Sequence, residues 1–448
     1  MPSTMFDSAI YRDMFGTPQM RAIFADEAFV AACVKTEVAL AKAEAQCGVI
    51  PADAAKAIAA GANAQSFDLA KLKVEADNVG YPIVGIVHQM AKQCGEAGRY
   101  IHWGATTQDI MDTATVLQIR EALTLVEMEL SDLRKCLAGL ALKHRDTAMA
   151  GRTHLQHALP VTFGYKVAIY LSMIVRHLER LSQLRPRVLV GQFAGAVGTL
   201  ASLGGKGLEV QAAMMAELGL GQPAITWHSA RDGLAETVAF LALIAGSLGK
   251  FATDVMLMMQ TEVGEAFEPF VAGRGSSSTM PQKRNPISCE LIVAMARITR
   301  EQSSLMLDGM LADHERATGP WHLEWVALPT AFLAASSALR QANFMMGGLI
   351  VDAARMRKNL DVSGGLIVAE KVMMELAPHT GRGVAHDLVY DACRAAMDKG
   401  VLLLDALVAQ KEITKHLDAK RLAELVDPAR YVGLAGEMVD RVLAMERE

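Results

Sequence analysis

The sequence has little of what marks several common protein classes. Only 5% of its 448 residues are aromatic, and its six cysteines are scattered without a Cys-x-x-Cys pair. Such spacing argues against a disulfide framework and against a thiolate zinc site, so we expect reduced thiols. The metalloprotease motif His-Glu-x-x-His is missing as well. We therefore expect neither a bound metal nor an organic cofactor.

A large excess of charge of one sign is also absent. The net charge is -5, with 44 basic and 49 acidic residues mixed along the chain, which gives no general attraction for nucleic acid or an anionic membrane. The most apolar run, residues 238–248, is shorter than the roughly 18 residues that a membrane helix needs. Residues 1–10 lack a basic, apolar leader. We expect a cytoplasmic protein that binds neither nucleic acid nor membrane.

Hydrophobic residues are abundant, at 52% of the chain, and they follow a helical pattern. Apolar side chains recur at intervals of three and four residues over long stretches, and no alternating strand pattern competes with them. The stretches cover residues 27–47, 113–145, 161–184, 234–261 and 286–311. The pattern predicts an all-α fold built around a bundle of long helices.

The length of the chain and shifts in its composition predict three domains. A chain of 448 residues exceeds the size of a single core, which stops growing near about 250 to 300 residues. We expect a small N-terminal helical domain over residues 1–112, a central long-helix bundle over 113–355 and a small C-terminal helical domain over 356–448.

Four polar islands interrupt the helical pattern. They read HWGATTQD (102–109), GRTHLQHALP (151–160), GRGSSSTMPQKRNP (273–286) and DHERATGPWHLEW (313–325). Each lies near the end of a predicted helix, where backbone amides lack partners and small hydroxyl residues cap well. Capping alone is therefore one explanation for any single island.

The third island has more than capping chemistry. Its serines and glycines offer hydroxyls and open amides, and Arg274, Lys283 and Arg284 add positive charge, which together suit a carboxylate or a phosphate. The Walker order of a phosphate loop is absent, and no predicted strand precedes it as in a nucleophile elbow. The island predicts a local anion site of another kind.

The islands and their order, together with the long-helix middle, resemble the fumarase/aspartase superfamily. SSTMPQKRNP is similar to the signature of that family, and HWGATTQD and GRTHLQHALP look like its other two active-site segments; Ser276 stands where the signature usually has glycine. The resemblance implies a fumarase/aspartase-like fold, with about twenty long helices in the core of a homotetramer. It also implies active sites that each draw segments from three subunits.

The family chemistry removes a proton beside a carboxylate of a small di- or tricarboxylate and expels a group from the adjacent carbon, usually giving fumarate. The resemblance implies that Ser277 is the general base and His154 the general acid, with Lys283 and Asn285 holding the carboxylate whose charge grows. The further residues for which we expect a role in substrate binding are His102, Thr106, Thr107, Gln156, Arg231, Ser278 and Arg316.

Within the superfamily, the chain is most similar to the branch that contains adenylosuccinate lyase and 3-carboxy-cis,cis-muconate cycloisomerase. Residues 77–84, DNVGYPIV, lack the Arg-His-Asp segment with which adenylosuccinate lyase holds a nucleotide phosphate. The cycloisomerase usually has a residue other than histidine where this chain has His154. Since His154 favours a leaving group that needs a proton, we expect a carbon-nitrogen lyase that splits an N-substituted aspartate into fumarate and an amine.

Two alternatives stay open beside this expectation. The first is the lactonising cycloisomerase, and the second, a minor one, is a helical oligomer without catalytic activity. The sequence does not identify the groups attached to the succinyl core. We expect side chains near the site to select among them, and the candidates are Tyr81, Trp103, Trp321 and Trp325.

Overall fold

The computed structural model describes residues 4–447, which contain nineteen α-helices and two small sheets of two strands each. The predicted all-α class is confirmed. The chain divides into two compact units: unit 1 comprises residues 1–131, 177–249 and 291–341, and unit 2 comprises residues 132–176, 250–290 and 342–448. The predicted division into three domains, at residues 112 and 355, stays a prediction.

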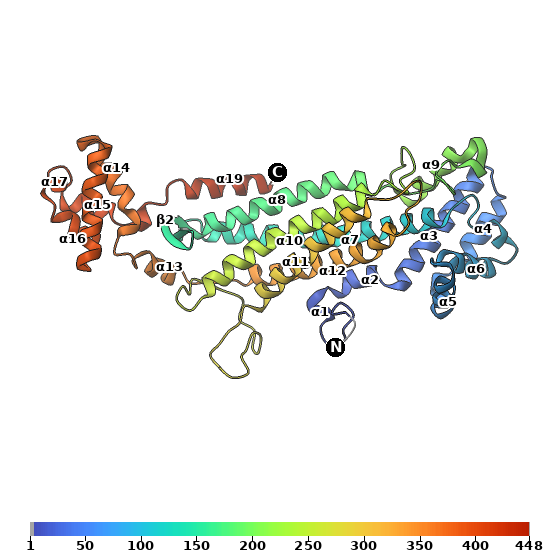
Figure 1. Cartoon of the computed structure of the whole chain (residues 1–448), viewed down its shortest axis with the longest axis horizontal. Coiled ribbons are helices and arrows are strands. Elements are labelled where there is room, and N and C mark those ends of the chain that lie inside the picture. The colour runs from blue at the N-terminus through green and yellow to red at the C-terminus, as the bar shows by residue number, and fades with distance from the viewer. Residues whose placement is uncertain (1–3, 448) are drawn as a thin grey trace. The chain divides into compact units, whose positions relative to one another are not determined.

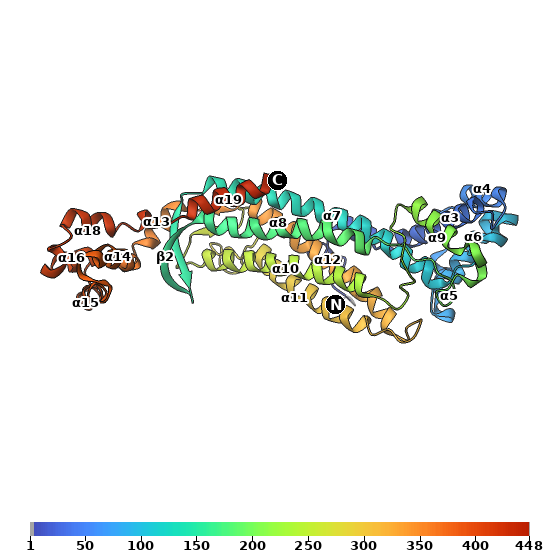
Figure 2. The same ribbon diagram turned by 90° about the horizontal axis from the view of Figure 1, so that it is seen from above.

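Five long helices contribute segments to both units, and within each unit these segments run side by side (Figures 1 and 2). The helices are α7 (Thr107–Lys143), α8 (Phe163–Val188), α10 (Asp232–Met259), α11 (Ile287–Gly309) and α12 (Pro320–Gly347). The first four confirm stretches that the apolar periodicity predicts. Helix α12 was not predicted as a helix, because its first turns carry the fourth polar island and Pro329 lies inside it.

Unit 1 gathers the N-terminal helices around α3, which confirms the predicted helix over residues 27–47. Helix α3 packs against α4 and α9, and Figure 1 shows these helices grouped with α5 and α6. The elements are α1 (Arg12–Phe15), α2 (Pro18–Ile23), α3 (Asp26–Gln46), α4 (Ala52–Gly61), α5 (Leu69–Val79), α6 (Ile83–Cys94) and α9 (Gly207–Leu218), with 3-10 turns at Ala64–Ser66, Gly95–Tyr100 and Ala201–Lys206. Fully buried Leu40, Ile58 and Met214 lie in their common core, where each such side chain stabilises the fold by about 1.5–3 kcal/mol.

Helix α10 carries apolar side chains on an exposed face as well as on its buried face. An 18-residue window within it has a mean hydropathy of 1.5, and half of that window is buried. By length and composition the helix could cross a membrane, but a core helix of a soluble protein passes the same test. Leu243 on this helix is 54% exposed and Leu257 is 37% exposed. These side chains give the helix an apolar face that the chain itself does not cover.

Unit 2 contains a β-hairpin where the sequence predicted only helices and loops. Strands β1 (Ala148–Thr153) and β2 (Gln156–Thr162) pair antiparallel across a two-residue turn. The second polar island therefore lies on this hairpin. Its strands were missed because their burial is irregular rather than alternating, with a shift of register between Ala150 and Arg152.

The rest of unit 2 is a set of short helices with their own apolar core. Figure 1 shows α14, α15, α16 and α17 gathered together, and Leu376, Leu403 and Leu407 are fully buried among them. The elements are α13 (Ala353–Leu360), α14 (Ala369–Thr380), α15 (Arg382–Lys399), α16 (Leu403–Val408), α17 (Lys411–Thr414), α18 (Ala419–Leu425) and α19 (Ala435–Arg447), with 3-10 turns at Leu366–Val368 and Pro428–Arg430 and the strand pair β3 (Ala266–Phe267) and β4 (Ile350–Val351). All six cysteines of the chain are free thiols.

Candidate active site

In unit 1 the first polar island forms the entry to α7, and a buried carboxylate holds it in place. Asp109 is fully buried and accepts hydrogen bonds from the backbone amides of Thr106 (3.0 Å), Ala194 (3.0 Å) and Gly195 (2.9 Å). The Nε2 atom of the buried His228 lies 2.8 Å from the same carboxylate. Asp109 thus fixes three loops at the start of α7. Neither Asp109 nor His228 was predicted from the sequence to belong to the site.

Thr106 and Thr107 lie at the amino end of α7, where both are half-buried. Because the first backbone amides of a helix lack intrahelical partners and its dipole is positive at this end, the position favours a bound carboxylate. The two hydroxyls are therefore placed where hydrogen bonds to such a group are useful.

His102 precedes this helix and is held by a second buried carboxylate. Its Nδ1 atom lies 2.7 Å from Oε1 of Glu37, and its backbone amide donates to Oε2 at 3.1 Å. The Glu37 side chain is fully buried, and that of His102 is 22% exposed. Burial lowers the pKa of His102, but the charge and hydrogen bond of Glu37, together with the charge of Asp109, outweigh this and raise it. Glu37 favours the imidazolium form and leaves Nε2 for a substrate.

The fourth island places Arg316 beside the same helix end. Its guanidinium donates to the backbone carbonyl of Ala196 (2.7 Å) and to Oε1 of Gln108 (3.4 Å), and Gln108 in turn donates to the backbone carbonyl of His228 (2.9 Å). An arginine has five N–H donors, of which these bonds use two. Gln108 follows Thr107 directly, so Arg316 lies at the amino end of α7.

Arg231 is placed differently, inside a buried ion-pair triad. It forms bidentate pairs with Asp112 (2.7 and 2.9 Å) and with Glu324 (2.7 and 2.5 Å), and it also donates to the backbone carbonyl of Trp227 at 3.4 Å. Burial, together with the charge of Asp112, raises the pKa of Glu324 by more than Arg231 lowers it. Since all five N–H groups of Arg231 are used within the protein, its predicted contact with substrate requires one of these pairs to open.

In unit 2 the second island presents His154 at the turn of the β1–β2 hairpin. His154 and Leu155 form the two-residue turn with φ values of 50° and 63°, and both are exposed, as is Gln156 beside them. Turns of this kind require positive φ at both positions and strongly favour Asn-Gly. Two bulky residues here store local strain of the sort that collects at functional sites. The hairpin thus keeps His154 away from the core at an energetic cost.

A salt bridge to a buried carboxylate anchors this hairpin close to its turn. Arg152 on β1 forms a bidentate pair with the fully buried Glu265 (2.7 and 2.8 Å), which also accepts a hydrogen bond from Asn359 at 2.8 Å. His157 lies opposite Arg152 on β2. Burial and the charge of Arg152 lower the pKa of His157, so this side chain favours the neutral imidazole.

The third island forms the loop between β3 and α11, and Figure 1 shows this loop extending away from the helices. Gly275 has a φ of 72°, and a Cβ atom there would lie 2.6 Å from the carbonyl oxygen of Asn285, so only glycine fits. The amide of Asn285 donates to the carbonyl of Gly275 at 2.9 Å, and Ser276 and Arg284 form an antiparallel bridge. These contacts bring the two ends of the loop together.

Within the loop, Ser277 Oγ faces backbone donors. It accepts hydrogen bonds from the amides of Thr279 (3.3 Å) and Met280 (3.1 Å). Successive amides directed at one oxygen form an anion-binding nest, which stabilises negative charge on that oxygen. Ser278 and Lys283 are exposed and Asn285 is half-buried in the same loop. The four predicted residues Ser277, Ser278, Lys283 and Asn285 therefore lie in one loop whose ends are held together.

The candidate residues are divided between the two units. Unit 1 holds His102, Thr106, Thr107, Arg231 and Arg316, whereas unit 2 holds His154, Gln156, Ser277, Ser278, Lys283 and Asn285. Among residues 4–447, no group of three or more His, Cys, Asp or Glu side chains has the arrangement of a metal site. The chemistry that these groups can supply is acid-base catalysis and carboxylate binding.

Comparison with family models gives two matches. A model described as lyase matches residues 14–299, and a model described as adenylosuccinate lyase C-terminus matches residues 365–442. The first match covers every candidate residue except Arg316, and the second covers helices α14 to α18.

Several named relatives match over nearly the whole chain. The chain is 46% identical to 3-carboxy-cis,cis-muconate cycloisomerase of Pseudomonas aeruginosa, over 96% of this chain and 95% of the relative. It is 46% identical to trans-aconitate decarboxylase 1 of Mycosarcoma maydis, over 99% and 90% of the two chains. It is 41% identical to N-acetyl-S-(2-succino)cysteine lyase of Dickeya dadantii, over 99% and 98%. Relatives at similar identity thus carry the names of three different reactions.

Solved structures agree with these matches. A fumarate lyase from Mesorhizobium sp. BNC1 is 56% identical, with a TM-score of 0.91 over 96% of this chain and 98% of that one. A 3-carboxy-cis,cis-muconate lactonizing enzyme from Pseudomonas putida is 42% identical, with a TM-score of 0.93 over 98% and 99% of the two chains. The fold of this chain is therefore that of these enzymes.

Proposed function

The chain belongs to the fumarase/aspartase superfamily of lyases, and on that premise we propose that it catalyses β-elimination from a succinyl-type substrate. The reaction that the geometry supports best is cleavage of the carbon-nitrogen bond of an N-substituted aspartate, which yields fumarate and an amine. The substrate is accordingly a small dicarboxylate or tricarboxylate, and the reaction needs no cofactor.

The observation that carries this proposal is the position of His154 at a strained, exposed turn. A nitrogen cannot leave as an amide anion in water, so it must receive a proton as its bond to carbon breaks. Histidine is the side chain best suited to donate that proton near neutral pH. A lactonising enzyme adds a carboxylate to a double bond and places a proton on the adjacent carbon; it expels no amine, so it has no leaving group to protonate.

Candidate residues from both units supply the base and the acid that the proposed elimination needs. Ser277 Oγ removes a proton from the carbon beside a substrate carboxylate, and the electron pair moves into that carboxylate to give the doubly negative aci-carboxylate. As this intermediate collapses, the carbon-carbon double bond forms and the carbon-nitrogen bond breaks, while His154 donates a proton to the nitrogen. The amides of Thr279 and Met280, which donate to Ser277 Oγ, support the alkoxide that the first step requires.

Carboxylate binding is divided among the remaining candidates. Lys283 and Asn285 hold the carboxylate that becomes the aci-carboxylate, where preorganised donors have their largest effect. The His102 imidazolium and the hydroxyls of Thr106 and Thr107 hold a second carboxylate at the amino end of α7. Gln156, Ser278 and Arg316 are further contacts to substrate in this proposal, and Arg231 positions α12 against α7 through Asp112 and Glu324.

We propose that the working form is a homotetramer in which each active site draws on three subunits. The apolar face of α10 supports this assembly, because Leu243 and Leu257 expose surface that a bundle of subunits would cover. The relatives with named activities are metabolic enzymes. We propose that this chain acts in the cytoplasm, without nucleic-acid or membrane partners.

A second candidate function is 3-carboxy-cis,cis-muconate cycloisomerase activity. The observation in its favour is the 46% identity to the Pseudomonas aeruginosa enzyme over 96% of this chain. The name of the Dickeya dadantii relative places its succino group on sulfur, so a carbon-sulfur bond is a further target for the same elimination.

A panel of substrates distinguishes these reactions. Purified protein is offered iminodisuccinate, adenylosuccinate, argininosuccinate, N-acetyl-S-(2-succino)cysteine, trans-aconitate and 3-carboxy-cis,cis-muconate, and fumarate, lactone and carbon dioxide are measured. We expect fumarate and free amine from at least one aminosuccinate. Formation of lactone alone overturns the proposal.

A further inference from the structure

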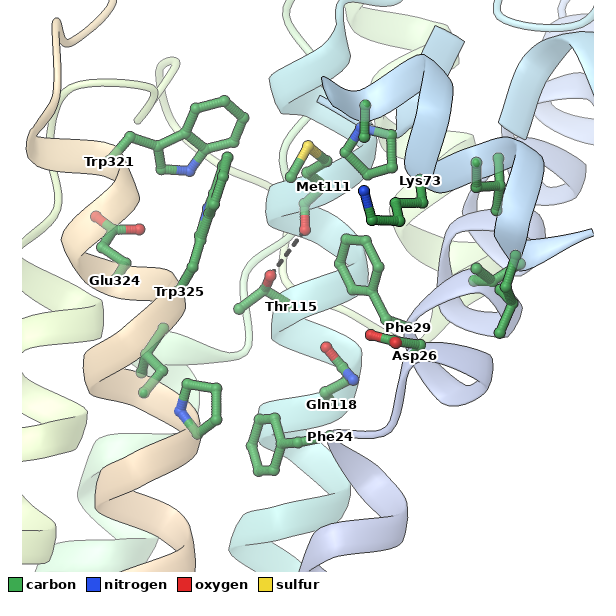
Figure 3. A pocket seen from close by; sticks show the side chains of 17 residues that line it. Phe24, Asp26, Phe29, Lys73, Met111, Thr115, Gln118, Trp321, Glu324 and Trp325 are labelled. Carbon is green, nitrogen blue, oxygen red and sulfur yellow. Dashed lines mark hydrogen bonds between the residues drawn. The ribbon is translucent and has the colours of Figure 1, made fainter. Parts of the chain in front are cut away.

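A pocket of ≈ 410 Å³ lies in unit 1 (Figure 3). Its lining includes Trp321 and Trp325, two of the side chains that we expected to select the substituent, but none of the predicted catalytic or carboxylate-binding residues. Its volume falls in the range of about 300–1,000 Å³ that is typical of small-molecule sites. Figure 3 shows Trp325 of α12 and Phe29 of α3 on opposite sides, with Met111 and Thr115 of α7 between them. Residues of α5 complete the lining, so the pocket is bordered by α3, α5, α7 and α12.

The pocket adjoins the proposed carboxylate-binding end of α7. Thr107, Met111, Thr115 and Gln118 follow one another at intervals of four, four and three residues, so they share one face of this helix. Met111 lies one turn after Thr107, which corresponds to a rise of about 6 Å. A substrate whose carboxylate binds at Thr107 can therefore reach the pocket with a substituent only a few bonds long.

The walls of the pocket are mainly aromatic and aliphatic. The ring centroids of Trp321 and Trp325 lie 5.2 Å apart, edge to face, and the ring centroid of Tyr81 lies 5.3 Å from that of Trp321. The other apolar side chains of the lining include Phe24, Phe29, Leu69, Leu72, Pro82 and Leu328. Such a surface gains free energy by burying apolar or aromatic groups.

The charged side chains of the lining do not form a site for a phosphate or a further carboxylate. Lys73 is its one cation among the described residues, and its ammonium lies 2.6 Å from Asp77. Both carboxylate oxygens of Glu324 accept hydrogen bonds from Arg231, and Asp26 adds a negative charge at the rim. An anionic group would therefore meet a lining that is acidic on balance.

We infer that this pocket receives the substituent on the leaving nitrogen, and that the preferred substrates are N-substituted aspartates whose substituent is aromatic or bulky and aliphatic. The inference rests on the proposed elimination, since it specifies the substrate class for that reaction. Phosphorylated and multiply carboxylated substituents are excluded by the same lining.

The first test compares two substrates that differ only in the size of the substituent. N-benzylaspartate and N-methylaspartate both release a protonated alkylamine, so the demands of the chemical step are similar. We expect kcat/KM to be at least about tenfold higher for the benzyl compound, because even one or two methylene groups give discrimination of that size in an apolar pocket. Equal values for the two substrates would overturn the inference.

A pair of matched variants shows whether the pocket causes this preference. Thr115→Met fills the pocket from α7, whereas Thr124→Met makes the same change on the same helix outside it. Both threonine hydroxyls donate to the carbonyl four residues earlier, at 2.9 Å to Met111 and 2.9 Å to Arg120. We expect Thr115→Met to reduce the benzyl-to-methyl ratio of kcat/KM at least about tenfold and Thr124→Met to retain it.

A second variant and a binding measurement separate this inference from the proposed function. Trp325→Ala removes a side chain that is 38% exposed, so the fold tolerates it, and it is expected to lower the same ratio. Binding of N-benzylaspartate is measured by calorimetry in the wild type and in both threonine variants. If neither substrate is turned over but Thr115→Met alone weakens binding, the result supports the pocket as a binding site and contradicts the proposed elimination. If N-benzylaspartate does not bind, or binds equally to all three proteins, the pocket assignment is wrong.

Discussion

His102 and Glu37 form a close hydrogen-bonded pair, with Nδ1 of the imidazole 2.7 Å from Oε1 of the carboxylate. The backbone amide of His102 donates to the other oxygen of Glu37, so the carboxylate holds both the ring and the main chain. His102 has a φ of 61°, an unusual value for a non-glycine residue, and the pair maintains it. The contact therefore fixes both the position and the charge of His102 at the entry to α7.

Replacement of Glu37 by glutamine is expected to make stability less dependent on pH. Because the pKa of His102 is raised in the folded state, the native protein binds its proton more tightly than the unfolded chain does. The pair therefore stabilises the wild type fully below about pH 6.5, the ordinary value of histidine, and this contribution is lost as pH rises through the raised pKa. Thermal unfolding at pH 5.5 and pH 9 measures the difference.

Glu75→Gln is the control, because it removes a carboxylate 3.7 Å from the exposed His88 without changing a buried pair. If Glu37→Gln loses as much stability between pH 5.5 and pH 9 as the wild type does, the pair does not control the charge of His102.

Ser277→Ala is expected to abolish turnover while substrate binding is largely retained. Removal of a general base typically costs about 10² to 10⁴ in rate, and the backbone amides and cations of the loop are unchanged in this variant. Single-turnover kinetics and calorimetric binding measure the two effects separately. Ser276→Ala serves as the control, since Ser276 Oγ donates only to the carbonyl of Gly273, at 2.9 Å, in the loop. Full activity in Ser277→Ala would show that another group is the base.

His154→Asn is expected to affect substrates according to their leaving group. An amine must be protonated as it departs, whereas a thiol with a pKa near about 8.5 can leave as the thiolate. We therefore expect a loss of about 10² to 10⁴ in kcat for aminosuccinates and a much smaller loss for N-acetyl-S-(2-succino)cysteine. His157→Asn on the same hairpin is the control. Equal losses for nitrogen and sulfur substrates would mean that His154 does not act as the acid.

Leu155→Gly is expected to stabilise the fold by about 1 kcal/mol, because glycine adopts a positive φ without steric cost. Leu159→Gly on β2 is the control and is expected to destabilise the fold, because the backbone there is extended and glycine weakens a strand. Urea unfolding of the two variants measures both changes. A loss of stability in Leu155→Gly would show that the turn is not strained by its side chain.

The helical framework could be predicted from the sequence because helices leave a local periodic pattern. Helices α3, α7, α8, α10 and α11 all begin and end within six residues of the predicted stretches. Helix α12 was not predicted because a polar island and Pro329 interrupt its apolar periodicity. The β1–β2 hairpin was not predicted because its turn requires a positive φ at His154 and Leu155. Neither histidine nor leucine favours that conformation.

The candidate site was less accessible to sequence reasoning for a related reason. The motif residues could be named because each island is contiguous, but their partners lie far along the chain. Glu37 is 65 residues from His102, and Asp109 is 119 residues from His228. Helical periodicity gives no information on such contacts. Their one local signal is a charged residue at a position that the apolar pattern would bury.

The most direct test of the proposed function is an assay that follows fumarate and lactone in the same sample. The purified protein is incubated separately with an N-substituted aspartate, such as N-benzylaspartate, and with 3-carboxy-cis,cis-muconate, and the products are resolved by chromatography. We predict that fumarate and the free amine form in equal amounts from the aspartate. Lactone from the muconate, with no fumarate from the aspartate or from any other aminosuccinate, would contradict the assignment of this chain as a carbon-nitrogen lyase.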